Sequence, residues 1–202
     1  ASTALMIDHA RKFFELSAYQ KLASTSNQSG IAIQSVFSDL KERLKKLALQ
    51  AEVRSMDPLL QKPILDQYTK LDPDIDAIGV LRLDGRVVAR SDGLPQIDFS
   101  SMEWFRLINS GKHVAYQAFT DKTFAKPTLI TAIAIRDSSQ AIIGAIFSIS
   151  NIRVLSEAMA GSDLDSATRT LLFDDHNELV LPQGKFEAPI PPDDYLPLNR
   201  LR

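Results

Sequence analysis

The chain has 202 residues, of which 45% are hydrophobic and 24% charged, enough for one well-buried core plus an appendage or for two small modules. Its 23 basic and 25 acidic residues give a formal net charge of -2, so no overall field would recruit nucleic acid or an anionic membrane. The lack of cysteine excludes disulfides, thiolate nucleophiles and cysteine zinc sites. The longest apolar run, residues 141–149, is too short to span a bilayer, so we expect membrane attachment only through flanking segments.

The N-terminal segment, residues 6–54, has the pattern of a long helix, because it contains no proline and only one glycine. The polar stretch 24–30 is a weak point, which leaves open either two helical halves or one helix of roughly 70 Å. In the second half, apolar residues recur at alternating steps of four and three, as in a coiled-coil seam. We expect this stripe to pack chiefly on the rest of the domain and, nearer the N-terminus, on a second copy in a homodimer. The stripe comprises Ile33, Phe37, Leu40, Leu44, Leu47 and Ala51.

A short helix and a hairpin are predicted next. The helix covers residues 63–70, with Pro63 in its first turn. Two strands, 78–83 and 87–90, flank Asp84-Gly85, a strong signal for a tight turn with Gly85 at positive φ.

The remaining elements complete an antiparallel sheet and begin a second module. A helix over 98–110, capped by Asp98 or Ser100, is followed by three strands and a connecting helix. Two further short strands repeat the first hairpin, and the proline-rich tail after them cannot supply central strands. The three strands cover 114–119, 128–135 and 141–149, the connecting helix 152–159, and the repeated hairpin 170–174 and 178–181.

Three local strings in this order resemble the Cache family, specifically the membrane-distal half of double Cache domains. They are residues 78–91 around Asp84-Gly85, residues 103–111 with Trp104-Phe105, and residues 142–147 with Gly144. The match covers residues 30–155, and residues 168–181 resemble the first hairpin of a membrane-proximal module. Each string alone is weakly specific, but their order and spacing together are more so.

The resemblance implies an α+β fold with a long N-terminal helix, a PAS-like five-stranded antiparallel sheet and the start of a second, incomplete module. The expected boundaries are 1–56 for the helix, 57–160 for the sensor module and 161–202 for the partial module. It also implies the periplasmic or extracellular part of an inner-membrane bacterial receptor. Such a module senses a small molecule and signals to a histidine kinase, diguanylate cyclase or chemoreceptor output domain.

The residues of the amino-acid-binding motif are missing from this chain. In Cache domains that bind amino acids, an arginine, a tyrosine and an aspartate stand where this sequence has Met102, Ile97 and Ile149. Without the carboxylate clamp and the ammonium partner, a free α-amino acid is not the expected ligand. A less polar ligand, or none, fits better.

The expected pocket lies between the sheet and residues 91–110. Trp104 and Phe105 are neighbours on a helix and point about 100° apart, so one can pack on the sheet while the other faces a cavity. The alternative for both is ordinary burial in the core. The candidate ligand-binding residues are Trp104, Phe105, Met102, Tyr116, Thr131 and Lys126.

Metal binding and catalysis are not expected. His9, His113 and His176 are far apart, and no calcium-loop pattern completes the alternating aspartates at 72–76. No Gly-x-Ser-x-Gly elbow or phosphate-binding glycine loop occurs, so we expect no cofactor and no enzyme activity.

A rival hypothesis is a Cache-like structural, dimerisation or protein-docking module. A space behind Trp104 filled by Met102, Phe105 and Phe124 would favour this rival, whereas an open, partly polar cavity would favour sensing. A soluble cytoplasmic PAS-type domain would explain the sheet but not the long leading helix.

Overall fold

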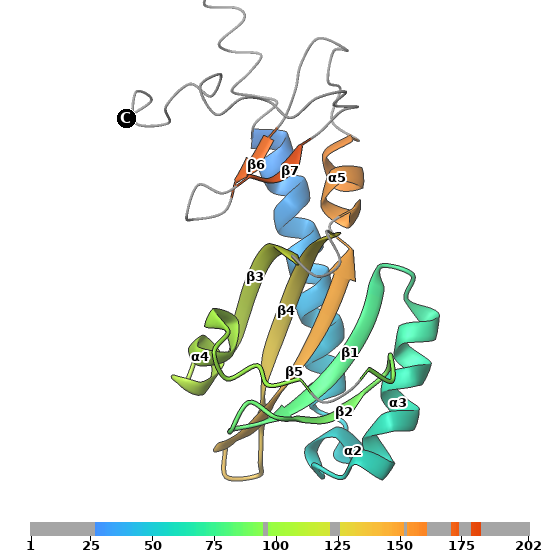
Figure 1. Ribbon diagram of the computed structural model, residues 1–202, viewed down its shortest axis with the longest axis vertical. Helices are drawn as coiled ribbons and strands as arrows, with labels where there is room; N and C mark the ends of the chain where they lie inside the picture. Colours follow the sequence, from blue (N-terminus) through green and yellow to red (C-terminus); the bar gives the residue numbers. More distant parts are fainter. Residues whose placement is uncertain are drawn as a thin grey trace, which may run out of the picture. The chain divides into compact units, whose positions relative to one another are not determined.

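The computed structural model describes residues 27–94, 97–121, 126–151, 153–160, 171–173 and 179–182. The chain divides into two compact units, residues 1–163 and 164–202. The first unit contains a five-stranded antiparallel sheet in the order β2-β1-β5-β4-β3 (Figure 1). The predicted α+β fold with a five-stranded antiparallel sheet is confirmed. The strands are β1 (Ile75–Arg82), β2 (Val87–Arg90), β3 (Val114–Asp121), β4 (Lys126–Arg136) and β5 (Ile142–Asn151).

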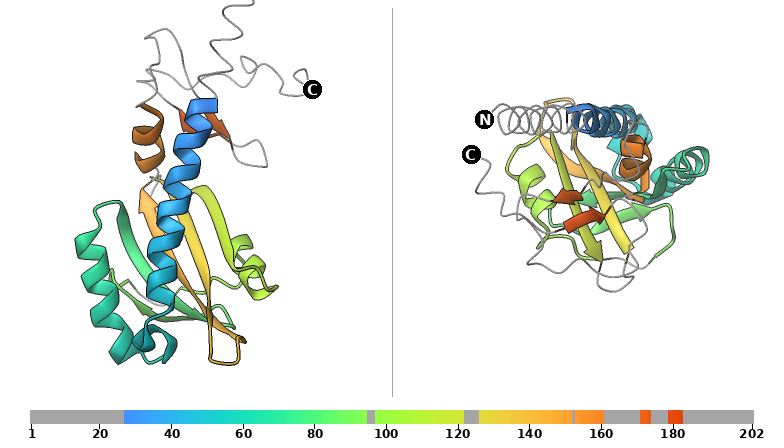
Figure 2. Two further views of the ribbon diagram at one scale, coloured as in Figure 1. Left: turned by 180° about the vertical axis from the view of Figure 1, so that it is seen from behind. Right: turned by 90° about the horizontal axis from the view of Figure 1, so that it is seen from above.

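A helix over residues 27–48 lies along one face of this sheet (Figure 2). Leu40, Leu44 and Leu47 are buried, as the apolar stripe predicts. Ala51 is exposed, so its place in the stripe was predicted wrongly. The helix stops at residue 48, and α2 (Ala51–Arg54) begins in a new register that buries Val53 instead. The first 26 residues lie outside the described chain, so the full length of the helix stays a prediction.

Helix α3 (Pro58–Leu71) begins five residues earlier than predicted. The Asp57 carboxylate accepts a hydrogen bond from the Leu59 N–H at 2.9 Å, and Pro58 occupies the first helical position. This cap sets the start of the helix. Pro63 therefore lies inside the helix, where its missing N–H falls in the second turn rather than the first.

The hairpin between β1 and β2 has the predicted geometry. Gly85 has a φ of 82°, and its N–H donates to the Arg82 carbonyl at 3.0 Å. The helix after it, α4 (Glu103–Asn109), begins later than expected. Asp98 accepts from the Ser100 N–H in a local turn, and the Phe99 N–H donates to the Gly85 carbonyl, so this segment is held to the hairpin instead of coiling.

Gly85→Val is expected to destabilise the domain by about 2 kcal/mol or more, because strain at positive φ is joined by a steric clash. A Cβ at Gly85 would lie 2.6 Å from the Ser100 backbone nitrogen. Gly93→Val is the matched control, because Gly93 also has positive φ but has open space around it. Urea denaturation of both variants measures the difference. Equal losses would show that the contact with Ser100 contributes nothing.

The remaining helix and hairpin follow β5 in the sequence. Helix α5 (Arg153–Ala160) belongs to the first unit and buries Val154 and Leu155. In the second unit, β6 (Leu171–Phe173) and β7 (Leu179–Pro182) pair antiparallel, which confirms the predicted second hairpin. The module boundaries at residues 56 and 160 stay predictions.

Candidate functional site

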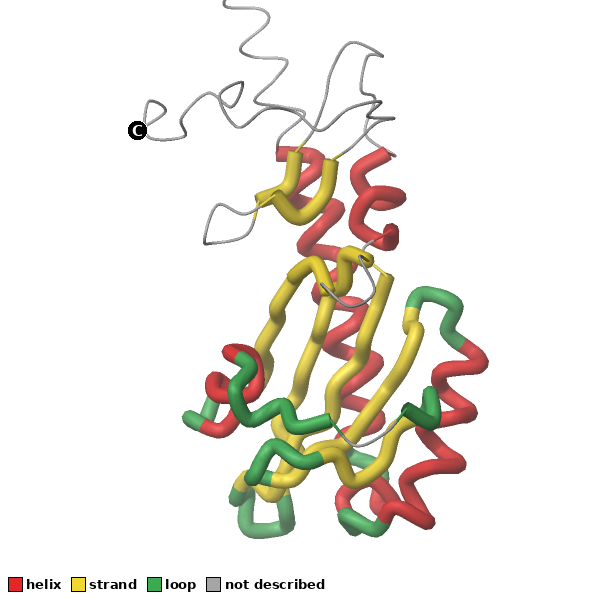
Figure 3. Tube along the Cα trace, in the orientation of Figure 1, coloured by secondary structure: helices red, strands yellow, loops and turns green. Residues whose placement is uncertain are grey.

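The sheet face opposite the 27–48 helix carries an aromatic cluster, defined here as Phe99, Trp104, Phe105 and Phe147. The loop after β2 and helix α4 lie over this face (Figure 3). The Trp104 ring centroid is 5.4 Å from that of Phe147 and 5.6 Å from that of Phe99. Phe105 meets Trp104 edge-on at 6.0 Å. The four rings are buried.

Gly79 makes room for this cluster. A Cβ at Gly79 would lie 2.5 Å from the Phe147 ring, so the side chain is absent where the ring must approach the backbone of β1. Trp104 and Phe105 belong to the same buried core, and Met102 packs against that core. That one of the two rings faces a cavity stays a prediction.

A buried arginine borders the cluster. Arg90, at the end of β2, places its guanidinium carbon 6.0 Å from the Phe99 centroid and 5.9 Å from that of Phe147. Its Nε donates to Asp92 Oδ1 at 2.9 Å and its Nη2 to Asp92 Oδ2, a bidentate pair. Sequence reasoning missed Arg90. The signal for it was a charged residue ending an apolar strand, two positions before an aspartate.

Two buried nitrogen donors at this site have no hydrogen-bond partner in the described part of the chain. They are Arg90 Nη1 and Trp104 Nε1. Buried donors are nearly always satisfied by protein, water or ligand, because an unmet donor costs about 1–3 kcal/mol. The cluster is therefore apolar in bulk and offers two N–H groups that an acceptor atom could satisfy.

The Arg90–Asp92 pair makes stability depend on pH. Burial opposes ionisation of Asp92, but hydrogen bonds from Arg90 and the Leu94 N–H, with the charge of Arg90, outweigh it and hold the pKa below 3.8. A lowered folded-state pKa stabilises the fold above the unfolded pKa, and this stabilisation is lost as pH falls through the folded value. Wild type should therefore lose more stability between neutral pH and about pH 3 than Asp92→Asn does. Denaturation at a series of pH values measures this, and parallel curves would contradict it.

Tyr116 and Thr131 lie on the opposite face of the sheet from Trp104. The Tyr116 ring is 4.9 Å from Phe37 of the 27–48 helix, and its hydroxyl donates to the Phe37 carbonyl at 3.5 Å. Burial, and then the charge of Glu42, raise the pKa of Tyr116. Thr131 pairs with Tyr116 across the β3–β4 ladder, so the two side chains share a face.

The prediction that Trp104 and Tyr116 line one pocket is therefore wrong. Side chains alternate along β3, so Gln117, not Tyr116, reaches α4. The Gln117 Oε1 accepts a hydrogen bond from the backbone N–H of Trp104 at 3.3 Å. The Thr131 hydroxyl is buried without a partner in the described residues, as are those of Ser148 and Ser150. Lys126 is the first residue of β4 and pairs with Asp121, and its side chain lies outside the described part, as does Phe124.

The positions of the amino-acid-binding motif are apolar in the structure as well. Met102 and Ile149 are partly buried and pack against the buried core that contains the aromatic cluster, while Ile97 is exposed. Within the described ranges, no group of three or more histidine, aspartate or glutamate side chains could hold a metal ion. No helix of those ranges has the length and hydropathy needed to cross a membrane.

The fold resembles solved sensor domains. The sensor domain of the V. cholerae histidine kinase DctB matches with a TM-score of 0.69 at 13% identity, over 92% of this chain and 75% of that one. The extracellular domain of rpHK1S-Z16 gives 0.66 at 15% identity, over 83% and 73%. The ligand-binding domain of the Campylobacter jejuni chemoreceptor Tlp3, solved with 4-methylisoleucine, gives 0.54 at 17% identity, over 79% and 69%.

No protein-family model and no curated protein matches the chain. At identities this low, the structural likeness establishes the fold. The chain has the PAS-like fold of extracytoplasmic sensor domains, as its resemblance to the Cache family predicts.

Proposed function

We propose that this chain is the extracytoplasmic sensing module of a bacterial transmembrane receptor. It binds a small molecule on the sheet face that carries the aromatic cluster, which we call the aromatic face. It signals to a cytoplasmic histidine kinase, diguanylate cyclase or chemoreceptor output domain. The observation that carries the proposal is the pair of buried, unpartnered donors, Arg90 Nη1 and Trp104 Nε1, on that face. The shared fold of the kinase and chemoreceptor sensor domains supports it.

The proposed ligand is uncharged or singly charged, carries hydrogen-bond acceptors and is not a free α-amino acid. Arg90 and Asp92 are paired with each other, so neither is a free partner for the carboxylate or the ammonium group of a zwitterion. Met102 and Ile149 present apolar groups where amino-acid-binding Cache domains carry charged ones. The proposed ligand class therefore differs from that of the Tlp3 domain, which was solved with 4-methylisoleucine and with L-valine.

The proposed signal is a shift between two arrangements of the loop after β2 and α4. A ligand that prefers one arrangement biases the equilibrium by its difference in affinity for the two. The sheet separates this loop from the 27–48 helix, whose Leu40, Leu44 and Leu47 are buried. We propose that a displacement of the sheet is transmitted to this helix. We also propose that the helix forms the homodimer and leads toward the membrane.

The packing of the aromatic cluster favours a second candidate function. Trp104 is fully buried among three other aromatic rings, and Met102 and Phe105 fill part of the space behind it. A module packed this way serves as a structural, dimerisation or protein-docking element without a small-molecule ligand.

A thermal-shift screen of uncharged and singly charged metabolites tests the proposal. A ligand bound on the aromatic face should stabilise wild type and lose most of this effect in Trp104→Phe, which keeps an aromatic ring but removes the indole N–H. Tyr116→Phe is the matched control, because Tyr116 lies on the other face.

Each outcome decides between the candidates. A hit that survives Trp104→Phe and disappears in Tyr116→Phe would place the ligand under the helix and contradict the proposed site. A hit that survives both variants binds elsewhere, which also overturns the site. The absence of any hit in a broad screen would favour the structural candidate.

A further inference from the structure

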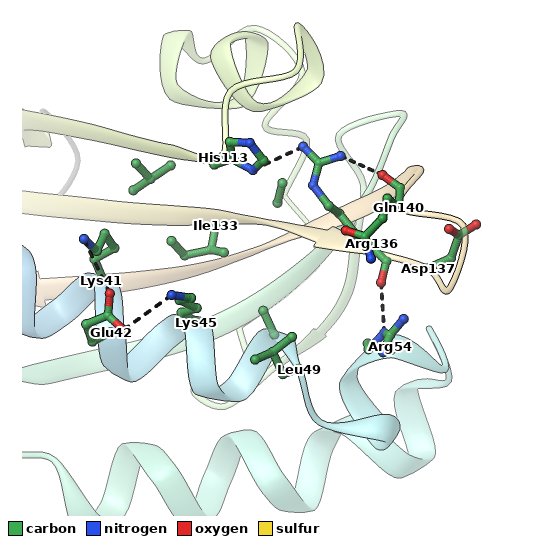
Figure 4. Close-up of a pocket in the computed structure, with 13 residues that line it drawn as sticks. Lys41, Glu42, Lys45, Leu49, Arg54, His113, Ile133, Arg136, Asp137 and Gln140 are labelled. Carbon is green, nitrogen blue, oxygen red and sulfur yellow. Dashed lines mark hydrogen bonds and ion pairs between the residues drawn. The ribbon is translucent and has the colours of Figure 1, made fainter.

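A pocket lies on the side of the sheet that carries the 27–48 helix, away from the aromatic cluster. It has a volume of about 500 Å³. Its walls come from the C-terminal end of that helix, from α2, and from the start of β3 together with the β4–β5 hairpin (Figure 4). The floor is apolar, with Ala48, Val114 and Ile133.

The rim of this pocket carries an excess of positive charge. The rim has four cationic side chains, those of Lys41, Lys45, Arg54 and Arg136. It has two carboxylates, those of Glu42 and Asp137, so lysines and arginines exceed carboxylates by two. This local sign is opposite to the formal charge of -2 on the whole chain. A cavity lined by one sign of charge concentrates ions of the opposite sign.

The two carboxylates of the rim are already engaged. Glu42 lies between two ammonium groups, 3.4 Å from Lys41 Nζ and 3.7 Å from Lys45 Nζ. Asp137 Oδ1 accepts from the Ser139 N–H, the Ser139 hydroxyl and the Ala141 N–H, all within its own turn. Among the residues that the structure describes, neither carboxylate makes an ion pair with an arginine of the rim, and Asp137 acts on Arg54 only through a longer-range electrostatic interaction.

The two arginines are held in place by backbone carbonyls and by the ring of His113. Arg54 Nε donates to the Arg136 carbonyl at 2.9 Å. Arg136 Nη1 donates to the Gln140 carbonyl at 2.7 Å, and its Nη2 lies 3.3 Å from His113 Nδ1 (Figure 4). These contacts orient both guanidinium groups without cancelling their charge. An organic carboxylate could neutralise this charge by accepting charge-assisted hydrogen bonds from the two guanidinium groups.

We propose that this pocket is a second ligand site, for a small organic carboxylate with an apolar body. The body rests on Val114, Ile133 and Ala48, and the carboxylate meets Arg54 and Arg136. Because its walls belong to the helix on one side and to the sheet on the other, an occupant holds these elements together. It would thereby bias the position of the helix independently of a ligand on the aromatic face.

Titration of the ¹⁵N-labelled protein with sodium benzoate, followed by amide NMR shifts, tests the proposal. Benzoate is expected to shift amides around Lys45, Leu49, His113 and Gln140, while uncharged benzyl alcohol does so far more weakly. Leu49→Glu should weaken benzoate binding about tenfold by placing a negative charge at the mouth, whereas Leu49→Gln, of equal size, should not. Leu49 is exposed, so both variants should fold.

Arg54→Gln should weaken benzoate binding to a similar degree, and Arg106→Gln, on the exposed side of α4, should leave it unchanged. Equal binding of benzoate and benzyl alcohol, or equal affinities of the two Leu49 variants, would overturn the carboxylate site. So would the lack of any shift at these amides up to tens of millimolar benzoate. Shifts confined to the Trp104 indole N–H would overturn it too, while leaving the aromatic-face proposal intact.

Discussion

Leu44→Asp is expected to lower the free energy of unfolding by about 4 kcal/mol or more. Leu44 is fully buried on the side of the 27–48 helix that also buries Leu40 and Leu47. The variant loses the transfer energy of a leucine and places a carboxylate among buried apolar side chains that include Leu40 and Leu47. Urea denaturation followed by far-UV circular dichroism measures the loss. Leu49→Asp is the matched control, expected to cost at most about 0.5 kcal/mol, because Leu49 is 66% exposed.

The concentration dependence of this loss separates two packing arrangements. If Leu44 packs within its own chain, the loss should be the same at all protein concentrations. A loss that shrinks on dilution would place Leu44 in a contact between two chains, because dilution removes the stabilisation that wild type gains from its partner. Equal stability of Leu44→Asp and Leu49→Asp would contradict the packing of the helix on the sheet.

Trp104→Ala is expected to destabilise the domain by about 3–5 kcal/mol. The indole is fully buried between Phe99, Phe105 and Phe147, so truncation leaves a cavity that rigid neighbouring rings cannot fill. Leu107→Ala, in the same helix but 36% exposed, should cost about 1 kcal/mol or less. Thermal and urea denaturation of the pair give the comparison.

The fluorescence of wild type is an independent measurement of the same packing. Trp104 is the only tryptophan in the chain, so the emission spectrum reports on this site alone. A fully buried indole should emit at short wavelength and shift to longer wavelength on unfolding. Emission typical of a solvated indole in the native protein, or similar stability losses in the two variants, would contradict the packed cluster.

Local patterns in the sequence determined the elements whose physical causes are themselves local. The turn at Asp84-Gly85 was predictable, because positive φ at Gly85 follows from residue type and position alone. The buried face of the helix was predictable through Leu40, Leu44 and Leu47 as far as its last turn. Beyond residue 48 the pattern failed at Ala51, because a break in the helix resets the register.

The tertiary structure alone decided which side chains share a site. Alternation along β3 shows that Tyr116 and Gln117 face opposite sides, but not which side meets α4. Both faces of the sheet are covered, so both are apolar and the sequence pattern cannot distinguish them. Arg90 was missed for a similar reason. Its burial depends on Phe99 in the loop before α4 and on Phe147 of β5, which is distant in sequence and meets Arg90 only in the folded domain.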